Sequence, residues 1–354
     1  MTNLEKMQSI LCDQTQALLL TSQVSRLYAA RYDVHEGVAM IGKGKCYYFT
    51  DSRYIEVAQN NLPDFTVQEM NREHLYPALI NSALKELGAE ALGIEEDYLT
   101  YGEYLYYEKS LSAQLVPCQK QISSFRQVKE PWELEYMKKA QQITDHAFAE
   151  ICKILAPGMT EKEAATELIH CLLKNGSEGL AFDPIVVSGP NSSKPHGVPG
   201  ERVMEYGDFV TMDFGAKVGG YCADMTRTVA LGFVNEEMRR VYDIVLQAQE
   251  AAIAATKEGV TGAQVDGVAR KIIEDAGYGQ YFGHGYGHSV GLEIHEAPNC
   301  SPGNREPLSA GVVCSAEPGI YLPGKFGVRI EDVVIVTSDG CEDITRSPKN
   351  LMII

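Results

Sequence analysis

Four carboxylates and one imidazole are the residues of this chain whose types and positions are best suited to chemistry. They lie in short segments that are rich in glycine or alternate like strands: Asp213, Asp224, His288, Glu317 and Glu331. An oxygen-dominated set with one imidazole suits a pair of divalent ions better than a single structural zinc. Because two ions held close together activate water and polarise a carbonyl group, the set predicts a dinuclear metal-dependent hydrolase.

The first two carboxylates lie on neighbouring strand-like segments, 209–218 and 221–231, which two glycines separate. Two glycines between alternating segments are typical of a hairpin turn. A register centred on that turn places Asp213 opposite Thr226, and Asp224 becomes a diagonal neighbour on the same face, roughly 7–8 Å away at Cα. Taken alone, two acidic residues on the solvated face of a hairpin explain this pair equally well.

Three of the eight histidines fall between positions 282 and 296, at His284, His288 and His295. The glycines interspersed among them let the backbone approach a ligand closely. The segment does not match the dinucleotide-binding fingerprint, because position 288 is a histidine. A core or solvated role is the ordinary explanation for any single histidine, but the cluster as a whole favours a binding site.

The last two carboxylates follow apolar runs. Pro318 biases Glu317 towards an extended backbone at a strand end, where a glutamate is usually solvated. Arg329 and Glu331 share one face of a segment that we predict to be a strand running on through position 336. Charged side chains within such an apolar strand need a partner or a metal.

The pattern of helices and strands that would position these residues predicts an α+β fold. We expect two domains, residues 1–125 and 126–354, with a boundary near Pro131. In the first domain the patterns predict strands at 17–21, 38–41, 47–50, 65–67 and 92–94 and a helix at 72–87. In the second they predict helices at 132–155, 160–175, 236–257 and 262–275. The strand-like segments between these helices carry nearly all of the chemistry.

Composition excludes several classes of partner. The net charge of −17 disfavours nucleic acid and anionic membranes, since both would repel the protein. The nine cysteines are dispersed without a C-x-x-C pair, which indicates reduced thiols. The first residues lack a basic segment followed by an apolar core, and no run approaches the ~18 apolar residues of a membrane span. We therefore expect a cytoplasmic protein that binds neither nucleic acid nor membrane.

Five ordered motifs together resemble those of the pita-bread metallopeptidases, and the two-domain length points to the Xaa-Pro aminopeptidase and prolidase branch. The motifs are Asp-Phe-Gly-Ala at 213–216, Ala-Asp-Met-Thr-Arg-Thr at 223–228, Gly-His-Ser-Val-Gly-Leu-Glu-Ile-His-Glu at 287–296, Ala-Glu-Pro-Gly at 316–319 and Val-Arg-Ile-Glu-Asp at 328–332. A weaker match, Phe-Thr-Asp-Ser-Arg-Tyr, lies at 49–54. The resemblance implies a C-terminal pita-bread catalytic domain preceded by a smaller α/β creatinase-type domain.

The resemblance also assigns roles to individual residues. It implies that two divalent ions are held by Asp213, Asp224, His288, Glu317 and Glu331, with Asp224 and Glu331 bridging them. Manganese is favoured, and cobalt, zinc or iron also suit such a site. Catalytic roles beside the metals are implied for His196, His295 and the proton shuttle Glu317. His284 and Arg329 are implied to be substrate-binding residues, His284 because it lines the pocket and Arg329 as a polar support of the ligand sphere.

The implied activity is hydrolysis of the Xaa-Pro bond at a free N-terminus by a metal-bridging hydroxide. The substrate is then a peptide with proline at its second position, and an aminopeptidase is favoured over a prolidase. A homodimer is implied by the resemblance alone. A creatinase-like amidinohydrolase or a non-catalytic binding module would be expected to have lost ligands, yet all five are present. A methionine aminopeptidase would lack the first domain.

Two segments depart from the family's pattern. Tyr286 stands where the motif usually carries a smaller residue, which predicts a narrower pocket rim. The stretch Arg26–Tyr32 in the first domain matches the family poorly. Because that domain often reaches the partner subunit's active site in this branch, the departure bears on the preferred length of the substrate.

Overall fold

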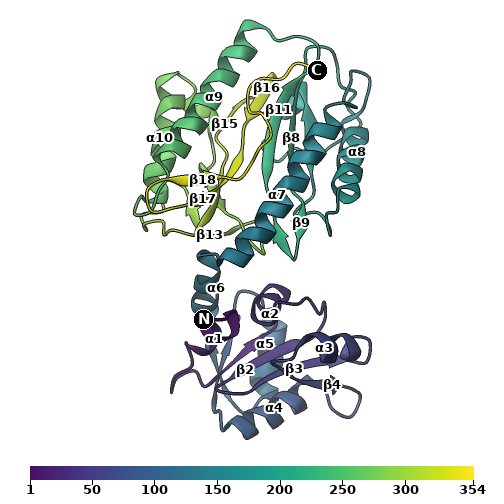
Figure 1. Cartoon of the computed structure of the whole chain (residues 1–354), viewed down its shortest axis with the longest axis vertical. Helices are drawn as coiled ribbons and strands as arrows, with labels where there is room; N and C mark the ends of the chain where they lie inside the picture. The colour runs from purple at the N-terminus through teal and green to yellow at the C-terminus, as the bar shows by residue number, and fades with distance from the viewer. The chain divides into compact units, whose positions relative to one another are not determined.

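Two units of mixed helix and strand make up the chain in the computed structural model, which describes residues 1–354 (Figure 1). The first unit is Met1–Arg126 and the second is Gln127–Ile354. None of the helices combines the length and the apolar character that crossing a membrane would require.

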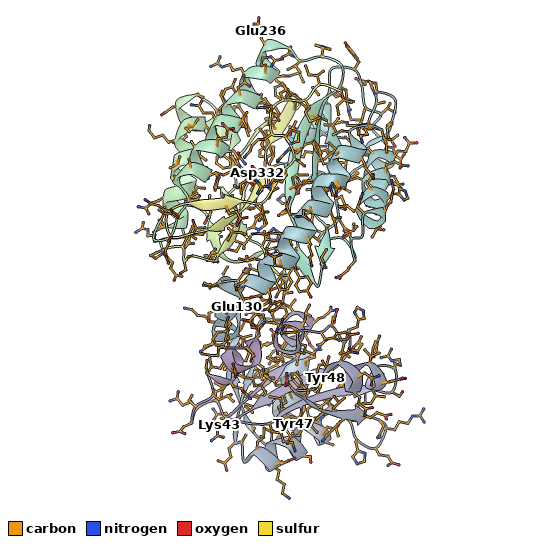
Figure 2. All side chains as sticks on the ribbon, in the orientation of Figure 1. Lys43, Tyr47, Tyr48, Glu130, Glu236 and Asp332 are labelled. Carbon is orange, nitrogen blue, oxygen red and sulfur yellow. The ribbon has the colours of Figure 1, made fainter.

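A six-stranded sheet organises the first unit, in the order β4-β3-β2-β1-β5-β6. The strands are β1 (Ala17–Leu20), β2 (Val38–Gly42), β3 (Cys46–Asp51), β4 (Thr66–Met70), β5 (Ala91–Ile94) and β6 (Gln114–Pro117). The helices are α1 (Asn3–Gln8), α2 (Gln23–Ala30), α3 (Ile55–Asn61), α4 (Tyr76–Leu87), α5 (Tyr101–Ser110) and α6 (Gln119–Gln127). The five predicted strands are confirmed. Most of their apolar side chains are buried in this unit, as are Tyr47 and Tyr48 of β3, which Figure 2 labels.

The helix predicted from position 72 begins instead at Tyr76. The side-chain oxygen of Asn71 accepts hydrogen bonds from the backbone N–H groups of Glu73 and His74, both at 2.9 Å. Such a turn competes with helix formation for the same backbone donors. Pro77 then fits the first turn of the helix, where its missing N–H costs nothing.

Helices cover the second unit on two sides, with strands between them (Figure 1). The helices are α7 (Pro131–Ile151), α8 (Glu161–Lys174), α9 (Glu236–Ala255) and α10 (Gly262–Asp275), and short 3₁₀ turns lie at Gly189–Ser193 and Gly279–Tyr281. All four predicted helices are confirmed. The capping box expected at Thr160 is present, since Thr160 Oγ1 accepts from Glu163 N and the Glu163 carboxylate accepts from Thr160 N.

The strands of the second unit form two main sheets and two short pairs. The larger sheet has the order β13-β12-β14-β17-β18, a three-stranded sheet has the order β11-β8-β7, and the pairs are β9-β10 and β15-β16. The bounds are β7 (Ile185–Ser188), β8 (Phe209–Phe214), β9 (Lys217–Val218), β10 (Tyr221–Cys222), β11 (Met225–Ala230), β12 (Gly287–Ser289), β13 (Glu296–Cys300), β14 (Val313–Ala316), β15 (Gly319–Leu322), β16 (Phe326–Arg329), β17 (Asp332–Val336) and β18 (Cys341–Asp343). One apolar core joins α7 and α8 to β8 and β11, and another joins α9 and α10 to β14, β16 and β17.

The hairpin register predicted from the two glycines is confirmed. Val218 pairs with Tyr221, and Asp213 pairs with Thr226 across β8 and β11. The turn residues Gly219 and Gly220 both have positive φ, which glycine adopts without strain. Local turn chemistry therefore fixes which face of this hairpin carries the first carboxylate.

The continuous strand predicted from Val328 to Val336 is wrong, because the chain leaves one sheet and enters another at Glu331. β16 pairs with β15, whereas β17 pairs with β14 and β18. Between them, Glu331 N donates to Thr226 O of β11 at 3.0 Å. This break turns the Glu331 carboxylate away from the apolar core that buries its neighbour Ile330.

Candidate metal centre

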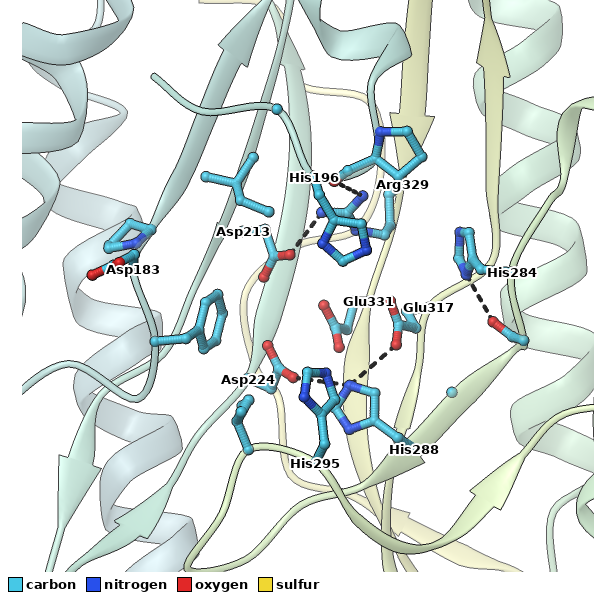
Figure 3. A pocket seen from close by; sticks show the side chains of 18 of the residues that line it. Asp183, His196, Asp213, Asp224, His284, His288, His295, Glu317, Arg329 and Glu331 are labelled. Carbon is cyan, nitrogen blue, oxygen red and sulfur yellow. Dashed lines mark hydrogen bonds and ion pairs between the residues drawn. The ribbon is translucent and has the colours of Figure 1, made fainter. Parts of the chain in front are cut away.

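One cavity of about 620 Å³ in the second unit gathers all nine residues that the sequence singled out. They are His196, Asp213, Asp224, His284, His288, His295, Glu317, Arg329 and Glu331. They come from the ends of strands and from the loops that follow them, in segments far apart in the sequence (Figure 3). The long-range part of the sequence interpretation, that these residues share one site, agrees with this geometry.

Asp224, His288 and Glu331 form the tightest group in the cavity. One ligand atom from each lies within 4.8 Å of the others. Both carboxylates are buried, at 3% exposure for Asp224 and 1% for Glu331. Figure 3 shows these side chains pointing toward one another. Three hard or borderline ligand atoms at this spacing could hold a divalent ion.

Glu317 and Asp213 extend the group on either side. Glu317 Oε1 lies 3.3 Å from His288 Nε2, and Asp224 Oδ2 lies 3.6 Å from the same nitrogen. Asp213 lies across the cavity, with its Oδ2 accepting a hydrogen bond of 2.7 Å from Arg329 Nη2. The five side chains thus give enough oxygen and nitrogen atoms for more than one ion.

The backbone around His288 orients its ring. Its Nδ1 lies 3.2 Å from the carbonyl oxygen of Ser289, a distance at which a protonated Nδ1 donates to that oxygen. Nε2 then faces the carboxylates with its lone pair available once the ring is neutral. A carbonyl partner of this kind fixes the tautomer of ligating histidines.

The metal-free carboxylates of Asp224 and Glu331 have pKa values well above their usual range. Burial is the main cause for both, and the negative charges of neighbouring carboxylates add to it. Burial also raises the pKa of Asp213, although the charge of Arg329 opposes that shift. These carboxylates resist ionisation because their negative charges lie close together in a buried site. A bound cation would balance those charges and so favour the ionised forms.

The His288 and Glu317 side chains form an ion pair, with His288 Nε2 at 3.3 Å from Glu317 Oε1. Burial alone would lower the pKa of His288, but its hydrogen bond and charge interaction with Glu317 outweigh burial and raise it to about 9. Burial likewise opposes ionisation of Glu317, yet His288 and Arg329 hold its pKa at about 2. Near neutral pH, Glu317 is therefore ionised and both ring nitrogens of His288 carry a proton.

Two buried oxygens in this cluster have no hydrogen-bond partner: Asp213 Oδ1 and Glu331 Oε1. Buried polar atoms are almost always satisfied, so orphaned carboxylate oxygens need an explanation. Both oxygens belong to residues that line the cavity beside Asp224 and His288. The donor set and these orphaned atoms fit divalent cations.

Arg329 ties several parts of the site together. Its Nε donates to Thr226 Oγ1, its Nη1 to Pro195 O and the Tyr321 hydroxyl, and its Nη2 to Asp213. Because every nitrogen is already engaged and the side chain is 4% exposed, the contacts favour support of Asp213 over direct substrate binding.

His284 also has both ring nitrogens occupied. Nδ1 lies 2.8 Å from the backbone carbonyl oxygen of Gly285, the next residue, and Nε2 lies 2.9 Å from the Tyr321 hydroxyl. The carbonyl can only accept, so Nδ1 carries the proton and Tyr321 donates to Nε2. Burial is the main reason that the pKa of His284 is lowered, which keeps the ring neutral. His284 thus presents its ring, with no free N–H group, to the cavity.

His196 and His295 lie at the exposed part of the cavity. The ring of His295 packs edge-on against that of His288, with centroids 4.3 Å apart. Burial, followed by the charge of His288, lowers the pKa of His295, so this imidazole is neutral at pH 7. No partner holds its nitrogens in the structure, and a neutral imidazole offers one N–H donor.

Replacement of Arg329 by methionine is expected to weaken metal binding and to lower kcat/KM by about 10–100-fold. The guanidinium orients Asp213 and Thr226, and methionine keeps the volume without the hydrogen bonds. Metal titration and steady-state kinetics measure both effects. The matched control is Arg305→Met, at an exposed position outside the cavity. Equal metal affinity in the Arg329→Met and wild-type proteins would contradict the role given to Arg329.

The prediction that Tyr286 narrows the pocket rim is wrong. Tyr286 is 1% exposed and belongs to the apolar core beneath α9 and α10. Gly285 and Gly287 on either side line the cavity instead. In an extended segment successive side chains point to opposite faces, so a residue between two cavity-lining positions points into the core.

Several polar side chains of the site were missed by the sequence analysis, among them Thr226, Ser315, Tyr321 and the cavity-lining Asp183. Thr226 Oγ1 donates to Glu331 Oε2 at 2.7 Å, and Ser315 Oγ donates to Glu317 Oε1 at 3.1 Å. Thr226 and Ser315 each lie two residues from a predicted ligand, so strand alternation places them near it. That spacing was the available signal for both, and nothing comparable marked the hydroxyl of Tyr321.

Comparison with known proteins gives two family matches and close relatives. The model described as metallopeptidase family M24 matches residues 135–338, and that of the creatinase/prolidase N-terminal domain matches residues 4–128. The Xaa-Pro dipeptidase of Pyrococcus furiosus is 40% identical over 263 residues, which cover 74% of this chain and 76% of that protein.

Two solved structures are similar over 99% of both chains. An Xaa-Pro dipeptidase from Bacillus anthracis is 40% identical with a TM-score of 0.96, and an X-Pro aminopeptidase from Thermotoga maritima is 36% identical with a TM-score of 0.93. These findings confirm the fold that the motifs implied, a pita-bread domain preceded by a creatinase-type domain.

Proposed function

The chain belongs to metallopeptidase family M24, and on that premise we propose that it is a dinuclear metal-dependent exopeptidase. It cleaves the Xaa-Pro bond at the free N-terminus of peptides. The observation that carries the proposal is the convergence of five carboxylates and four histidines on one cavity. The relatives named as Xaa-Pro peptidases support the choice of substrate.

The residues proposed to hold two divalent cations, manganese being favoured, are Asp213, Asp224, His288, Glu317 and Glu331. Bound there, the cations would supply the acidity that turns water into a nucleophile and the positive charge that polarises the scissile carbonyl group. Asp224, Glu331 and His288 would form the centre of this ligand set, which is consistent with their place in the tightest group of ligand atoms.

Glu317 is the proposed proton shuttle. Its carboxylate lines the cavity and would stay ionised beside bound cations, so it can accept a proton from the attacking water. The leaving group is the ring nitrogen of proline, which must gain a proton as the bond breaks. Ser315 donates to one carboxylate oxygen and thereby fixes the direction of the other.

His196 and His295 are the proposed donors to the substrate carbonyl oxygen. Negative charge develops on that oxygen in the transition state, and a neutral imidazole N–H directed at it stabilises the charge. His295 meets the requirement of neutrality because burial and the nearby charge of His288 lower its pKa. Both side chains lie on loops at the open part of the cavity, where a substrate enters.

Apolar side chains line the rest of the cavity and suit the hydrophobic parts of a substrate, the proline ring among them. Phe182, Ile185 and Ile294 contribute to this wall. The His284 ring, whose nitrogens are both engaged, adds a flat surface. A proline ring has no N–H group once it is acylated, so a wall without free donors matches its chemistry.

An aminopeptidase is favoured over a dipeptidase by the charges of the cavity. A dipeptide differs from a longer peptide in the free carboxylate on its proline, and an available cation binds such a group best. Among the residues that line the cavity, Arg329 is the one lysine or arginine, and Asp213 already neutralises it. A cytoplasmic location and a homodimer, which this geometry does not address, stay predictions.

The cleavage specificity is tested with three peptides that differ in one feature each. One has proline at its second position, one is its N-acetylated form, and one has alanine in place of proline. With manganese present, mass spectrometry should find removal of the first residue from the first peptide alone. Cleavage of the acetylated peptide, or equal cleavage of the alanine peptide, would contradict an Xaa-Pro exopeptidase.

Metal binding is expected to release protons and to strengthen as the pH rises. The pKa of about 9 leaves a proton on His288 near neutrality, and the raised pKa values of Asp224 and Glu331 make these carboxylates bind protons more readily than usual. Because cations must displace these protons, metal affinity falls as the pH drops. It should rise with pH until about pH 9, the pKa of His288. Calorimetric titration in buffers of different ionisation enthalpy measures the release. An apparent enthalpy that is the same in all buffers would contradict this prediction.

A further inference from the structure

The backbone at Glu331 is held by β11 and not by the sheets on either side of it. Glu331 N donates to Thr226 O at 3.0 Å, and Glu331 O accepts a short hydrogen bond from Arg227 Nη1. A guanidinium therefore completes the backbone hydrogen bonding at the point where the chain passes between sheets. The position of the Glu331 carboxylate depends on this link.

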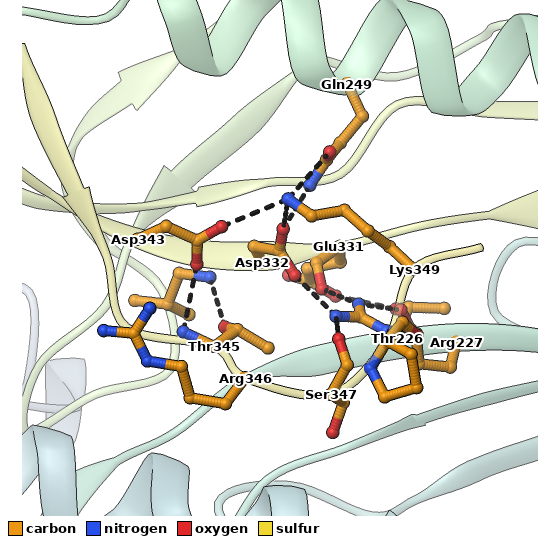
Figure 4. A network of polar contacts seen from close by, with 12 residues as sticks. Thr226, Arg227, Gln249, Glu331, Asp332, Asp343, Thr345, Arg346, Ser347 and Lys349 are labelled. Atoms are coloured by element: carbon orange, nitrogen blue, oxygen red, sulfur yellow. Dashed lines mark hydrogen bonds and ion pairs between the residues drawn. The ribbon is translucent and has the colours of Figure 1, made fainter.

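Arg227 lies on the side of β11 that faces away from the cavity. Its neighbour Thr226 faces the cavity and donates to Glu331 Oε2. The Arg227 side chain is 1% exposed, pairs with Asp332 Oδ1 at 2.7 Å and also donates to the carbonyl oxygens of Ser347 and Pro348 (Figure 4). A fully buried charge with this many partners is held in one orientation.

Asp332 passes the network on to a segment near the end of the chain. Its Oδ2 accepts hydrogen bonds from Gln249 Nε2, at 2.7 Å, and from Lys349 Nζ. Lys349 Nζ also lies 3.1 Å from Asp343 Oδ2. The backbone carbonyl oxygen of Lys349 accepts a hydrogen bond from the Tyr242 hydroxyl. Neither Arg227, Asp332 nor Lys349 lines the cavity, so none of them can touch a substrate there.

We propose that Arg227 and Lys349 are positioning residues of the metal centre, which act on Glu331 through Asp332 and the backbone. Arg227 holds the peptide that carries Glu331. Lys349 balances the second oxygen of Asp332, so that Asp332 and Arg227 keep their orientation. The inference rests on the proposed function, because it assigns to Glu331 the role of a metal ligand. Partners of ligating residues are known to tune metal affinity in this way.

The test is manganese affinity, measured by titration with detection of free manganese by electron paramagnetic resonance. Lys349→Met is expected to weaken binding by about 10–100-fold. At saturating manganese, its KM for an Xaa-Pro-Yaa peptide should stay within about twofold of wild type, because no residue that touches the substrate has changed, so the remaining loss of activity should appear in kcat. Lys349→Arg keeps the charge and should recover most of the affinity.

Two further variants separate positioning from a general loss of stability. Gln249→Leu removes the other donor to Asp332 Oδ2 from α9 and should weaken manganese binding in the same direction. Val245→Ala creates a cavity in the core beside α9, where Val245 is fully buried, and should lower stability without changing affinity. An affinity within twofold of wild type in both Lys349→Met and Gln249→Leu overturns the inference, as does an equal loss in Val245→Ala.

The wild-type protein and a Glu331→Gln variant distinguish a failure of this inference from a failure of the proposed function. Wild-type protein that binds no manganese, or binds it equally well after Glu331→Gln, overturns the metal centre itself. If the wild type binds and Glu331→Gln does not, an unaffected Lys349→Met overturns only the role of the network.

Discussion

Replacement of Glu331 by glutamine is expected to lower kcat/KM for an Xaa-Pro-Yaa peptide by about 10³-fold or more. The carboxylate is 1% exposed, and one of its oxygens is orphaned in the metal-free protein. Glutamine keeps the shape and can still accept a hydrogen bond from Thr226, but it removes the negative charge that a cation bound at this group would require. This fall in kcat/KM should be accompanied by a loss of bound metal, measured by elemental analysis.

The matched control for that prediction is Glu342→Gln. Glu342 lies on β18 of the larger sheet and pairs with Lys138 at 2.9 Å, with its side chain 45% exposed. An exposed pair of this kind contributes little, so this variant should keep its activity and metal content. Full activity in the Glu331→Gln variant would show that this carboxylate is not a ligand.

Replacement of Lys129 by methionine is expected to lower the free energy of unfolding of the second unit by about 3–5 kcal/mol. Lys129 Nζ lies 2.9 Å from Glu296 Oε2, and the two side chains are 1% and 3% exposed. Methionine fills similar space but leaves the Glu296 charge without its cation in the interior. Urea unfolding can be followed by the fluorescence of Trp132, the single tryptophan, which lies at the start of α7 in this unit.

Two variants test whether that loss comes from burying the Glu296 charge without Lys129. Adding Glu296→Gln to Lys129→Met removes the charge and should recover part of the stability, since a buried amide costs less than a buried ion. Lys162→Met breaks an exposed pair with Glu201 and should leave the unfolding transition unchanged. If Lys129→Met unfolds at the wild-type urea concentration, the buried pair contributes no net stability.

The local parts of the site could be predicted from the sequence because short-range rules determine them. The two glycines after Val218 set the hairpin register, which gave the correct partner for Asp213. Alternation correctly put Arg329 and Glu331 on one face and Ile330 on the other. Capping residues correctly located the start of the helix after Thr160.

The parts that sequence reasoning missed depend on contacts between distant segments. The strand break at Glu331 follows from hydrogen bonds with Thr226 and Arg227, about a hundred residues earlier, and no local signal marks it. The burial of Tyr286 follows from its packing under α9 and α10. Comparing the motif around Tyr286 with that of the family does not reveal this packing. The Tyr321 hydroxyl belongs to the site because it contacts Arg329 and His284, and these contacts form only in the folded chain.

The measurement that tests the account most directly is hydrolysis by chelator-treated protein of an Xaa-Pro dipeptide and an Xaa-Pro-Yaa tripeptide, with and without added manganese. We expect no cleavage without metal and restored cleavage with it. The tripeptide should be preferred, because Asp213 already neutralises Arg329, the one cationic side chain that lines the cavity. Cleavage of neither peptide, with manganese shown to be bound, would contradict the assignment of an Xaa-Pro peptidase.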